Sequence, residues 1–219
     1  LLIDFDPQAN ATSGIGLKPD CINFSVYHLL ESASNLDNVL CPTAFSNLHV
    51  FPSGKELAGA EVELASVKNR ELYLKERLSK VRYYYDYVII DCAPSLGLLT
   101  VNALVSSDRA IIPVQCEYFA LEGIAGLVHT LTQVNENFNP DLEIAGIVLT
   151  MFDKRTSLNR QVVDNTRRFF KDLVFETIVP RNIRLTEAPS HGLPISLYDE
   201  MSMGAIAYKN LTKEVVIRV

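Results

Sequence analysis

The sequence predicts an α/β protein whose sheet is mostly parallel and carries helices on both faces. Short apolar runs recur along the chain, as in buried parallel strands, and helical patterns lie between most of them. Two of the runs lead into an aspartate, which is typical of a sheet that binds ligands at the carboxyl ends of its strands. The expected strands are residues 1–3, 48–51, 87–90, 110–114, 144–151 and 174–178.

Helices are expected between these strands, which implies right-handed crossovers. The predicted helices are residues 24–30, 55–80 with a break near Ser66, 96–107 after a possible N-cap at Ser95, and 117–137. A further helix is expected to have Ser157 as its N-cap and to bury Val162, Val163, Phe169 and Phe170. A cluster with proline and glycine at residues 188–192 indicates a late loop.

Length and composition favour one domain over residues 1–219, because 219 residues at 48% hydrophobic content can bury a sizeable core. The longest apolar runs are far shorter than the roughly 20 residues of a membrane span, so no membrane segment is predicted. The four cysteines have no Cys-x-x-Cys spacing, which argues against a zinc or redox site. Reduced thiols in a cytosolic protein are therefore expected at Cys21, Cys41, Cys92 and Cys116.

The net charge of −6 is unevenly distributed along the chain. Residues 1–150 contain 9 Lys and Arg against 18 Asp and Glu, whereas residues 151–219 contain 11 against 8. A basic second part can offer one face to a polyanion, or it can be a solvated surface without a partner. The charge counts leave both interpretations open.

Asp91 follows the apolar run 87–90, so its carboxylate is expected at the tip of a buried strand. Mg²⁺ favours one or two carboxylates together with waters and substrate phosphates, so a single aspartate suffices there. The alternative is an aspartate that only caps the turn after the strand. Pro94 and Gly97 shape the loop beyond it, which could sense whether a terminal phosphate is present.

Asp4 and Asp6 end the first apolar run. A spacing of two places both carboxylates on one side of an extended segment, while Phe5 points into the core. One carboxylate can then orient an attacking water while the other supports the turn or the metal shell. Like charges this close are unfavourable without a cation, which favours a nearby Mg²⁺.

The chain shows no loop that would hold the phosphates of a nucleotide. No segment matches Gly-x-x-x-x-Gly-Lys-Ser/Thr, whose backbone N–H groups cradle phosphate. The nearest pair, Gly54-Lys55, is followed by Glu56 and has His49 in place of the first glycine. Because Leu1 already lies inside an expected strand, without methionine or cap, we expect that a front segment has been lost.

Four segments resemble the ParA/Soj family of deviant Walker ATPases, and the resemblance extends from Leu1 to about Lys213. They read Asp-Phe-Asp-Pro-Gln-Ala-Asn-Ala-Thr-Ser-Gly at 4–14, Tyr-Val-Ile-Ile-Asp-Cys-Ala-Pro-Ser at 87–95, Val-Gln-Cys-Glu-Tyr-Phe-Ala-Leu-Glu-Gly at 114–123 and Pro-Arg-Asn-Ile-Arg-Leu-Thr-Glu-Ala-Pro-Ser-His-Gly at 180–192. The resemblance implies a P-loop NTPase-like fold, in a single domain that lacks its first strand and its P-loop.

The resemblance also implies a function. Members of this family use ATP and Mg²⁺ in a dimerisation switch, and the ATP-bound homodimer binds DNA non-specifically. A ParB-type centromere-binding protein stimulates hydrolysis, and the cycle partitions chromosomes or plasmids. We therefore expect a cytoplasmic, nucleoid-associated protein that does not bind membranes.

The site residues follow from the same resemblance. Asp6 is expected to position the attacking water, Asp91 to be the Walker B aspartate that holds the metal, and Pro94 to belong to the second switch. The other expected nucleotide contacts are Asn10 and, at the adenine, Thr150, Met151, Pro180 and Arg181.

The chain departs from the family pattern in two places. The Lys-Gly-Gly-Val-Gly-Lys-Thr-Thr loop is absent, so residues 1–219 alone are expected to show no measurable ATP turnover. Residues 199–204 read Asp-Glu-Met-Ser-Met-Gly, where many relatives carry arginines. DNA contacts, made to phosphates and independent of sequence, are therefore expected at Arg155, Arg160, Arg167, Arg168, Lys171 and Arg184.

Two alternative functions remain open. A MinD-like division-site ATPase would lie on a membrane through a C-terminal amphipathic helix, but residues 208–219 have few basic side chains and no clear apolar face. A non-catalytic module would only dock DNA or a partner protein. The scattered histidines predict no metal cluster, and Cys92 is expected to be a packed thiol rather than an iron–sulfur ligand.

Overall fold

A computed structural model describes residues 1–18, 22–30, 36–95, 97–118 and 120–219. These residues form two compact units, and each is described by itself. The first unit comprises Leu1–Ser106 with Pro189–Leu193, and the second comprises Ser107–Ala188 with Pro194–Val219. Cys21, Leu96 and Phe119, named above, lie outside the described residues. The extent of one domain over residues 1–219 stays a prediction.

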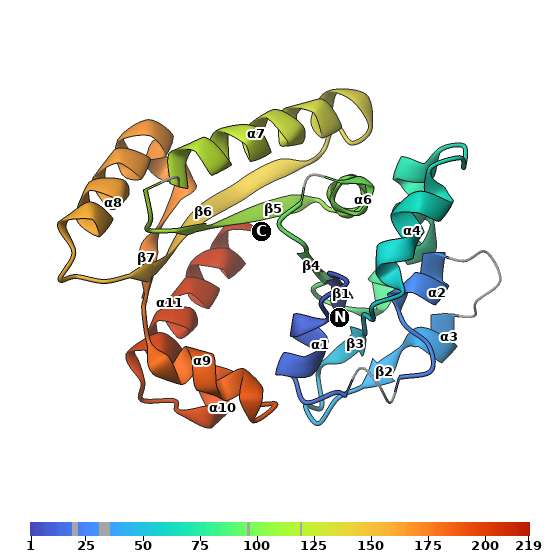
Figure 1. Ribbon diagram of the computed structural model, residues 1–219, viewed down its shortest axis with the longest axis horizontal. Coiled ribbons are helices and arrows are strands. Elements are labelled where there is room, and N and C mark those ends of the chain that lie inside the picture. The colour runs from blue at the N-terminus through green and yellow to red at the C-terminus, as the bar shows by residue number, and fades with distance from the viewer. Residues whose placement is uncertain (19–21, 31–35, 96, 119) are drawn as a thin grey trace. The chain divides into compact units, whose positions relative to one another are not determined.

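The first unit contains a four-stranded sheet with the order β2-β3-β1-β4 (Figure 1). β1 (Leu2–Phe5) lies between β3 (His49–Phe51) and β4 (Ile89–Cys92), and both pairings are parallel. The short β2 (Cys41–Pro42) pairs antiparallel with β3 and was not predicted from the sequence. The sheet is therefore mostly parallel, as expected.

The helices of the first unit are shorter than predicted. The expected helix over 55–80 is α4 (Leu57–Leu64) and α5 (Tyr73–Leu78), so the break near Ser66 is confirmed. The expected helix over 24–30 begins only at Val26, and the one over 96–107 is described as α6 (Leu98–Ser106). The remaining elements are α1 (Asn10–Gly14), α2 (Val26–Leu30), α3 (Leu36–Val39) and the 3₁₀ turns Arg70–Leu72 and Arg82–Tyr84.

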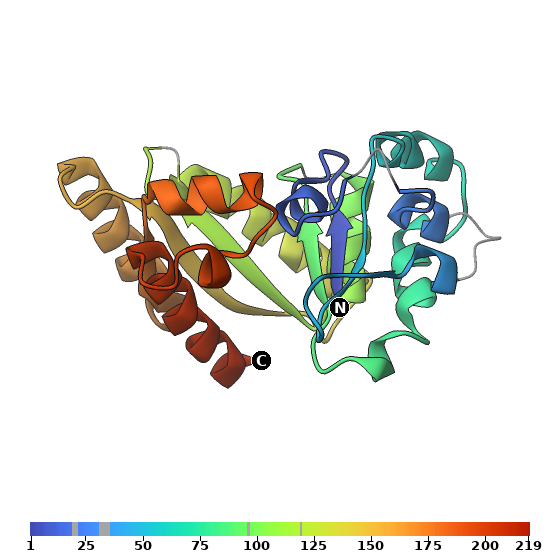
Figure 2. The same cartoon turned by 90° about the horizontal axis from the view of Figure 1, so that it is seen from below.

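The second unit contains a parallel sheet with the order β5-β6-β7, formed by Arg109–Gln115, Glu143–Phe152 and Val174–Pro180. α11 (Met203–Arg218) packs on one face, where Val148, Phe175 and Val179 meet its Ala207 and Leu211. α7 (Ala120–Asn137) and α8 (Ser157–Phe170) lie on the other face (Figures 1 and 2). α9 (Ile183–Ser190), α10 (Ile195–Tyr198) and the 3₁₀ turn Lys171–Leu173 complete the chain. The predicted fold class is confirmed.

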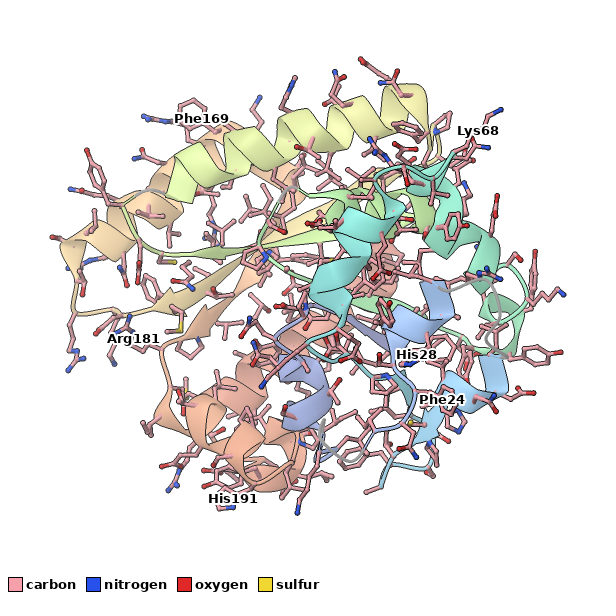
Figure 3. All side chains as sticks on the ribbon, turned by 45° about the vertical axis from the view of Figure 1, so that its right-hand side comes forward. Phe24, His28, Lys68, Phe169, Arg181 and His191 are labelled. Atoms are coloured by element: carbon pink, nitrogen blue, oxygen red, sulfur yellow. The ribbon has the colours of Figure 1, made fainter. Side chains whose placement is uncertain are left out.

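Two details of α8 and one of the late loop were predicted wrongly. Thr156, not Ser157, is the N-cap residue of α8, and its side chain makes no capping hydrogen bond. Phe169 is 65% exposed (Figure 3), because the buried stripe of α8, which contains Val162, Val163 and Thr166, ends before it. α9 extends into the predicted loop as far as Ser190 and includes Pro189, and its residue Ala188 is buried.

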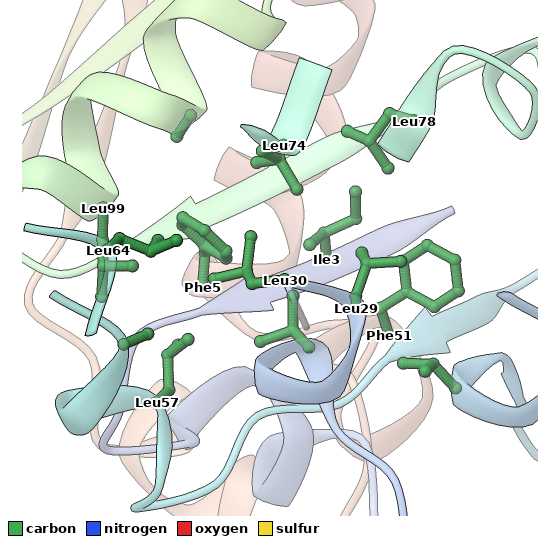
Figure 4. Packing of buried hydrophobic residues seen from close by; sticks show 14 of the residues in the cluster. Ile3, Phe5, Leu29, Leu30, Phe51, Leu57, Leu64, Leu74, Leu78 and Leu99 are labelled. Atoms are coloured by element: carbon green, nitrogen blue, oxygen red, sulfur yellow. The ribbon is translucent and has the colours of Figure 1, made fainter. Parts of the chain in front are cut away.

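The core of the first unit covers one face of its sheet. Ile3 and Phe5 of β1 and Phe51 of β3 are fully buried against leucines from α2, α4, α5 and α6 (Figure 4). Because side chains alternate along a strand, Leu2 and Asp4 lie on the opposite face. The core thus anchors β1 so that an aspartate points to the other side of the sheet.

The expected burial of residues 87–90 was wrong in part. Ile89 is 62% exposed, and the strand extends to Cys92, so Asp91 lies inside β4 rather than after it. Among the described strands β4 pairs with β1 alone, so it is an edge strand of the first unit's sheet. An edge strand exposes more of its side chains than a central strand does.

Candidate active site

Three aspartates lie at the carboxyl ends of β1 and β4. The parallel register places Asp4 directly beside Asp91, and Ile3 beside Ile90. Directly paired residues in a sheet share a face, so both carboxylates lie on the face opposite the core. Asp6 follows β1 in the next turn and is half-buried.

Asp4 is fully buried and is held by neutral donors. Its Oδ2 accepts hydrogen bonds from the backbone N–H and the Oγ1–H of Thr12, both at 2.7 Å, and its Oδ1 accepts one from Asp6 N at 3.3 Å. Thr12 Oγ1 in turn accepts from Ser53 N at 3.0 Å. Of the two roles considered for this pair, Asp4 therefore supports the turn that presents Asp6.

Asp91 has the opposite environment. No hydrogen bond or ion pair to its carboxylate occurs within the described ranges. Although the residue as a whole is exposed, partial burial raises the pKa of its carboxyl group, and the negative charges of Asp4 and Asp6 raise it further. The ionised form of the Asp91 carboxyl group is thus disfavoured, and a bound cation would stabilise it.

The donor set at Asp91 fits Mg²⁺. A single accessible carboxylate next to two further acidic groups supplies oxygen ligands and negative charge, while waters and phosphates would complete the shell. In the part of the chain that the structure describes, no group of three His, Cys, Asp or Glu side chains could hold a metal by itself. The arrangement therefore suits a metal that arrives with a nucleotide better than a structural metal.

The turn after β1 is tightly organised. Gln8 N donates to Asp6 Oδ1 at 2.9 Å, and Ala9 N donates to Asp6 O at 2.9 Å. Ala9 is buried and has a φ of 54°, a left-handed conformation that is unusual without glycine and is often found at functional sites. Asn10 begins α1 as an exposed residue, and Pro94 is exposed in the loop after β4. Their expected contacts with nucleotide stay predictions.

Cys92 packs against the core of the first unit, as predicted. Burial raises the pKa of its thiol to about 12, with smaller contributions from Asp91 and Asp6. Cys41 and Cys116 are free thiols as well. A protonated, packed sulfur beside Asp91 is a poor ligand and a poor nucleophile.

The residues expected at adenine come together in the second unit. Thr150 and Met151 lie at the end of β6, and Pro180 and Arg181 lie at the end of β7. The register pairs Phe152 with Pro180, and Arg181 N donates to Phe152 O at 2.9 Å. Met151 is 38% exposed and has a φ of 56°. The four residues therefore lie at one edge of this sheet, although their contact with adenine is untested.

Asn159 holds together the chain at this edge of the second sheet, and this role was not predicted from the sequence. Its buried side chain donates from Nδ2 to Cys116 O at 2.5 Å and accepts at Oδ1 from Asp153 N at 2.6 Å. It thereby joins the chain after β5 to the chain after β6. The only signal for it was a polar residue three positions before Val162 on the buried stripe of α8.

The candidate DNA contacts differ in how far their charge is already compensated. Arg155 donates to the Asp153 carboxylate from its guanidinium and from its backbone N–H, and these hydrogen bonds strongly lower the pKa of Asp153. Arg167 lies 3.7 Å from a Glu176 carboxylate oxygen, and Arg184 contacts both Glu187 at 2.8 Å and Asp199 at 3.3 Å. The others are exposed and have no carboxylate partner within the described ranges: Arg160, Arg168 and Lys171.

No helix within the described ranges is long and apolar enough to span a bilayer.

The acidic strand ends and the parallel sheets are the features of a nucleotide-binding ATPase, and comparison with known proteins gives the same class. Residues 1–144 match a family model described as an AAA domain. The chain is 50% identical over 215 residues to the sporulation initiation inhibitor protein Soj of Bacillus subtilis, covering 98% of this chain and 85% of that protein. It is also 50% identical over 218 residues to the chromosome partitioning protein ParA of Myxococcus xanthus, covering all of this chain and 77% of that protein.

The fold is shared with solved structures. A cobyrinic acid a,c-diamide synthase from Mycobacterium smegmatis, with bound ATP analogue and magnesium, superimposes with a TM-score of 0.82 at 33% identity and covers 97% of this chain and 79% of that one. The chain belongs to the ParA/Soj family of chromosome partitioning ATPases.

Proposed function

We propose that this protein is an ATP-dependent dimerisation switch that binds DNA non-specifically and partitions chromosomes or plasmids with a ParB-type partner. The observation that carries the proposal is the strand register that places Asp4 beside Asp91. The Asp91 carboxylate has no partner within the described residues, whereas the Asp4 carboxylate is held by hydrogen bonds. Membership of the family, and a similar structure that holds an ATP analogue and magnesium, support the choice of ligand.

Each acidic residue then has its own role. When bound, Mg²⁺ supplies positive charge to the phosphates, and Asp91 is the residue that would hold it. Asp6 orients the attacking water through its free carboxylate oxygen, because phosphoryl transfer depends mainly on positioning and charge. Thr150, Met151, Pro180 and Arg181 contact adenine, while Asn10 and Pro94 contact the remaining nucleotide.

Turnover requires a phosphate-binding loop, and residues 1–219 contain none that matches the motif. We therefore expect no measurable phosphate release from these residues alone, and ready release from a polypeptide that carries the family's Lys-Gly-Gly-Val-Gly-Lys-Thr-Thr loop ahead of residue 1. Comparable turnover by the two polypeptides would refute this part of the proposal.

DNA binding is expected to rest on the basic side chains that lack a carboxylate partner. Replacing Arg168 with alanine should reduce the slope of log affinity against log salt by about 0.9, because each phosphate contact releases about one counterion. Replacing Arg155, whose charge Asp153 already compensates, should change the slope less. Equal slopes for the wild type and both variants would place the DNA face elsewhere.

The partner and the location complete the proposal. A ParB-type protein together with DNA is expected to stimulate phosphate release by the ATP-bound homodimer in the cytoplasm, on the nucleoid. Liposome flotation is expected to show no membrane association. Flotation with anionic vesicles would instead favour the MinD-like alternative.

A further inference from the structure

The amino end of α6 is held by a carboxylate from a different helix. Glu61 belongs to α4, where Leu57, Ala60 and Leu64 are buried in the core, and Glu61 itself is half-buried next to that stripe. Its Oε1 accepts a hydrogen bond from Leu99 N at 3.2 Å. A contact across 38 residues of sequence thus joins α4 to the start of α6.

The contact satisfies a need of the helix. Leu99 is the second residue of α6, and the first N–H groups of a helix have no partner within the helix. A negative charge is also favourable at this end, because the helix dipole is positive there. Glu61 meets both requirements from outside the helix.

Gly97 leaves the space that Glu61 occupies. A Cβ at this position would lie 2.2 Å from Glu61 Oε1, so the carboxylate fills the place of a side chain. Gly97 O also accepts from Val101 N at 3.1 Å, which makes it part of the first turn. The backbone at the start of α6 therefore lies directly against the carboxylate.

We propose that Glu61 is a positioning residue that fixes where the chain enters α6 after Asp91 and Pro94. Its importance for turnover rests on the function proposed above, because Asp91 and Pro94 are there assigned to the metal and the nucleotide. A fixed α6 holds the end of β4 in one arrangement, and small errors in position reduce the rate of phosphoryl transfer.

Amide hydrogen exchange measured by NMR on residues 1–219 tests the contact itself. Glu61→Ala is expected to speed exchange at the Leu99 amide by about tenfold, since it removes a hydrogen bond to a charged group. Glu61→Gln, which keeps an acceptor oxygen, should restore most of the protection. Unchanged exchange at Leu99 in Glu61→Ala would overturn the proposal.

Glu63 provides a matched control on the same helix. Its carboxylate accepts from Tyr27 Oη at 2.9 Å and makes no hydrogen bond or ion pair with α6 within the described residues. Glu63→Gln is expected to leave exchange at Leu99 unchanged. An equal acceleration in Glu63→Gln would show a general loosening of α4 and would also overturn the proposal.

A second variant avoids removing any side chain. Gly97→Ala would push the Glu61 carboxylate away, so it should speed exchange at Leu99 as Glu61→Ala does, and the double variant should show no additional effect. Gly59→Ala is the control, because an added Cβ there lies 3.6 Å from Glu63 Oε1, an ordinary contact. Full protection of Leu99 in Gly97→Ala would contradict the proposed contact.

Turnover separates this proposal from the proposed function. In a polypeptide with a phosphate-binding loop, Glu61→Ala should lower kcat several-fold and leave KM within about twofold, because positioning acts on the reacting complex. If the wild type shows no ATP turnover at all, the proposed function fails. The exchange result at Leu99 still tests the contact between Glu61 and α6. Normal kcat together with faster exchange at Leu99 would overturn the positioning role.

Discussion

The carboxyl ends of the two sheets are built in different ways. At the ends of β1 and β4, acidic side chains face one another, and Asp91 has no partner within the described residues. At the ends of β6 and β7, backbone groups and the amide of Asn159 are bonded to each other. A bound cation would therefore stabilise the first end, whereas the groups of the second end already bond to one another. We expect catalysis to depend on the first end and local stability on the second.

The largest effect is expected from Asp6. In a polypeptide with a phosphate-binding loop, Asp6→Ala should reduce kcat by about 10²-fold or more, because a positioned acid or base contributes roughly 10²- to 10⁴-fold. Binding of Mg²⁺ and ATP should persist, since Asp91 remains. Single-turnover phosphate release measures the loss, with Asp141→Asn in an exposed loop as the control. Normal turnover in Asp6→Ala would remove Asp6 from the chemistry.

Thr12 tests how much the hydrogen bonds to buried Asp4 contribute to the free energy of unfolding. Thr12→Val removes the hydroxyl that donates to buried Asp4 and accepts from Ser53 N, which should lower the free energy of unfolding by about 2 kcal/mol. Chemical denaturation measures the change. Thr132→Val is the control, because Thr132 is exposed and bonds only to Val128 O of its own helix. Equal stability of the two variants would show that Asp4 does not need this donor.

Asn159 should have a smaller, local effect. Asn159→Ala leaves Asp153 N and Cys116 O without their partner and should lower the free energy of unfolding by about 1.5 kcal/mol. Hydrogen exchange should accelerate at Asp153 and leave β1 and β4 unchanged. Asn137→Ala is the control, since Asn137 is exposed and its amide bonds only to Gln133 O. Faster exchange throughout the chain would contradict a local role.

The smallest expected effect is a pH dependence at Asp91. Its pKa is raised in the folded state, so ionisation costs stability once the pH exceeds its ordinary value, and the cost is complete above the folded pKa. Asp91→Asn should therefore unfold at a higher denaturant concentration at neutral pH. The difference should vanish below the ordinary range of a carboxyl group. A stability gain that stays constant with pH would exclude this electrostatic cause.

Much of the fold could be predicted from local patterns. Apolar runs predicted the parallel strands. The alternation of side chains along a strand predicted that Asp4 and Phe5 point to opposite faces. Both signals depend on neighbouring residues only. β2 and the exposure of Ile89 could not be predicted in this way, since they depend on which strands lie at an edge. The exposure of Phe169 depends on where the core ends along α8.

The sequence indicated the acidic residues of the candidate site, whose roles stay predictions, and it did not indicate the residues that support them. Asp4, Asp6 and Asp91 are marked by their position after apolar runs. Asn159 and Glu61 act on backbone groups 43 and 38 residues away, and such contacts leave no periodic pattern in the sequence. The polar groups that hold a site together are therefore harder to predict than the groups that point into it.

Isothermal titration calorimetry of ATP, with and without Mg²⁺, tests the central claim most directly. The polypeptide should carry a phosphate-binding loop ahead of residue 1, and the comparison is between the wild type and Asp91→Ala. We predict strong binding only with Mg²⁺ in the wild type, and a loss of that Mg²⁺ dependence in Asp91→Ala. Equal binding by the two proteins under both conditions would contradict the assignment of the metal to the ends of β1 and β4.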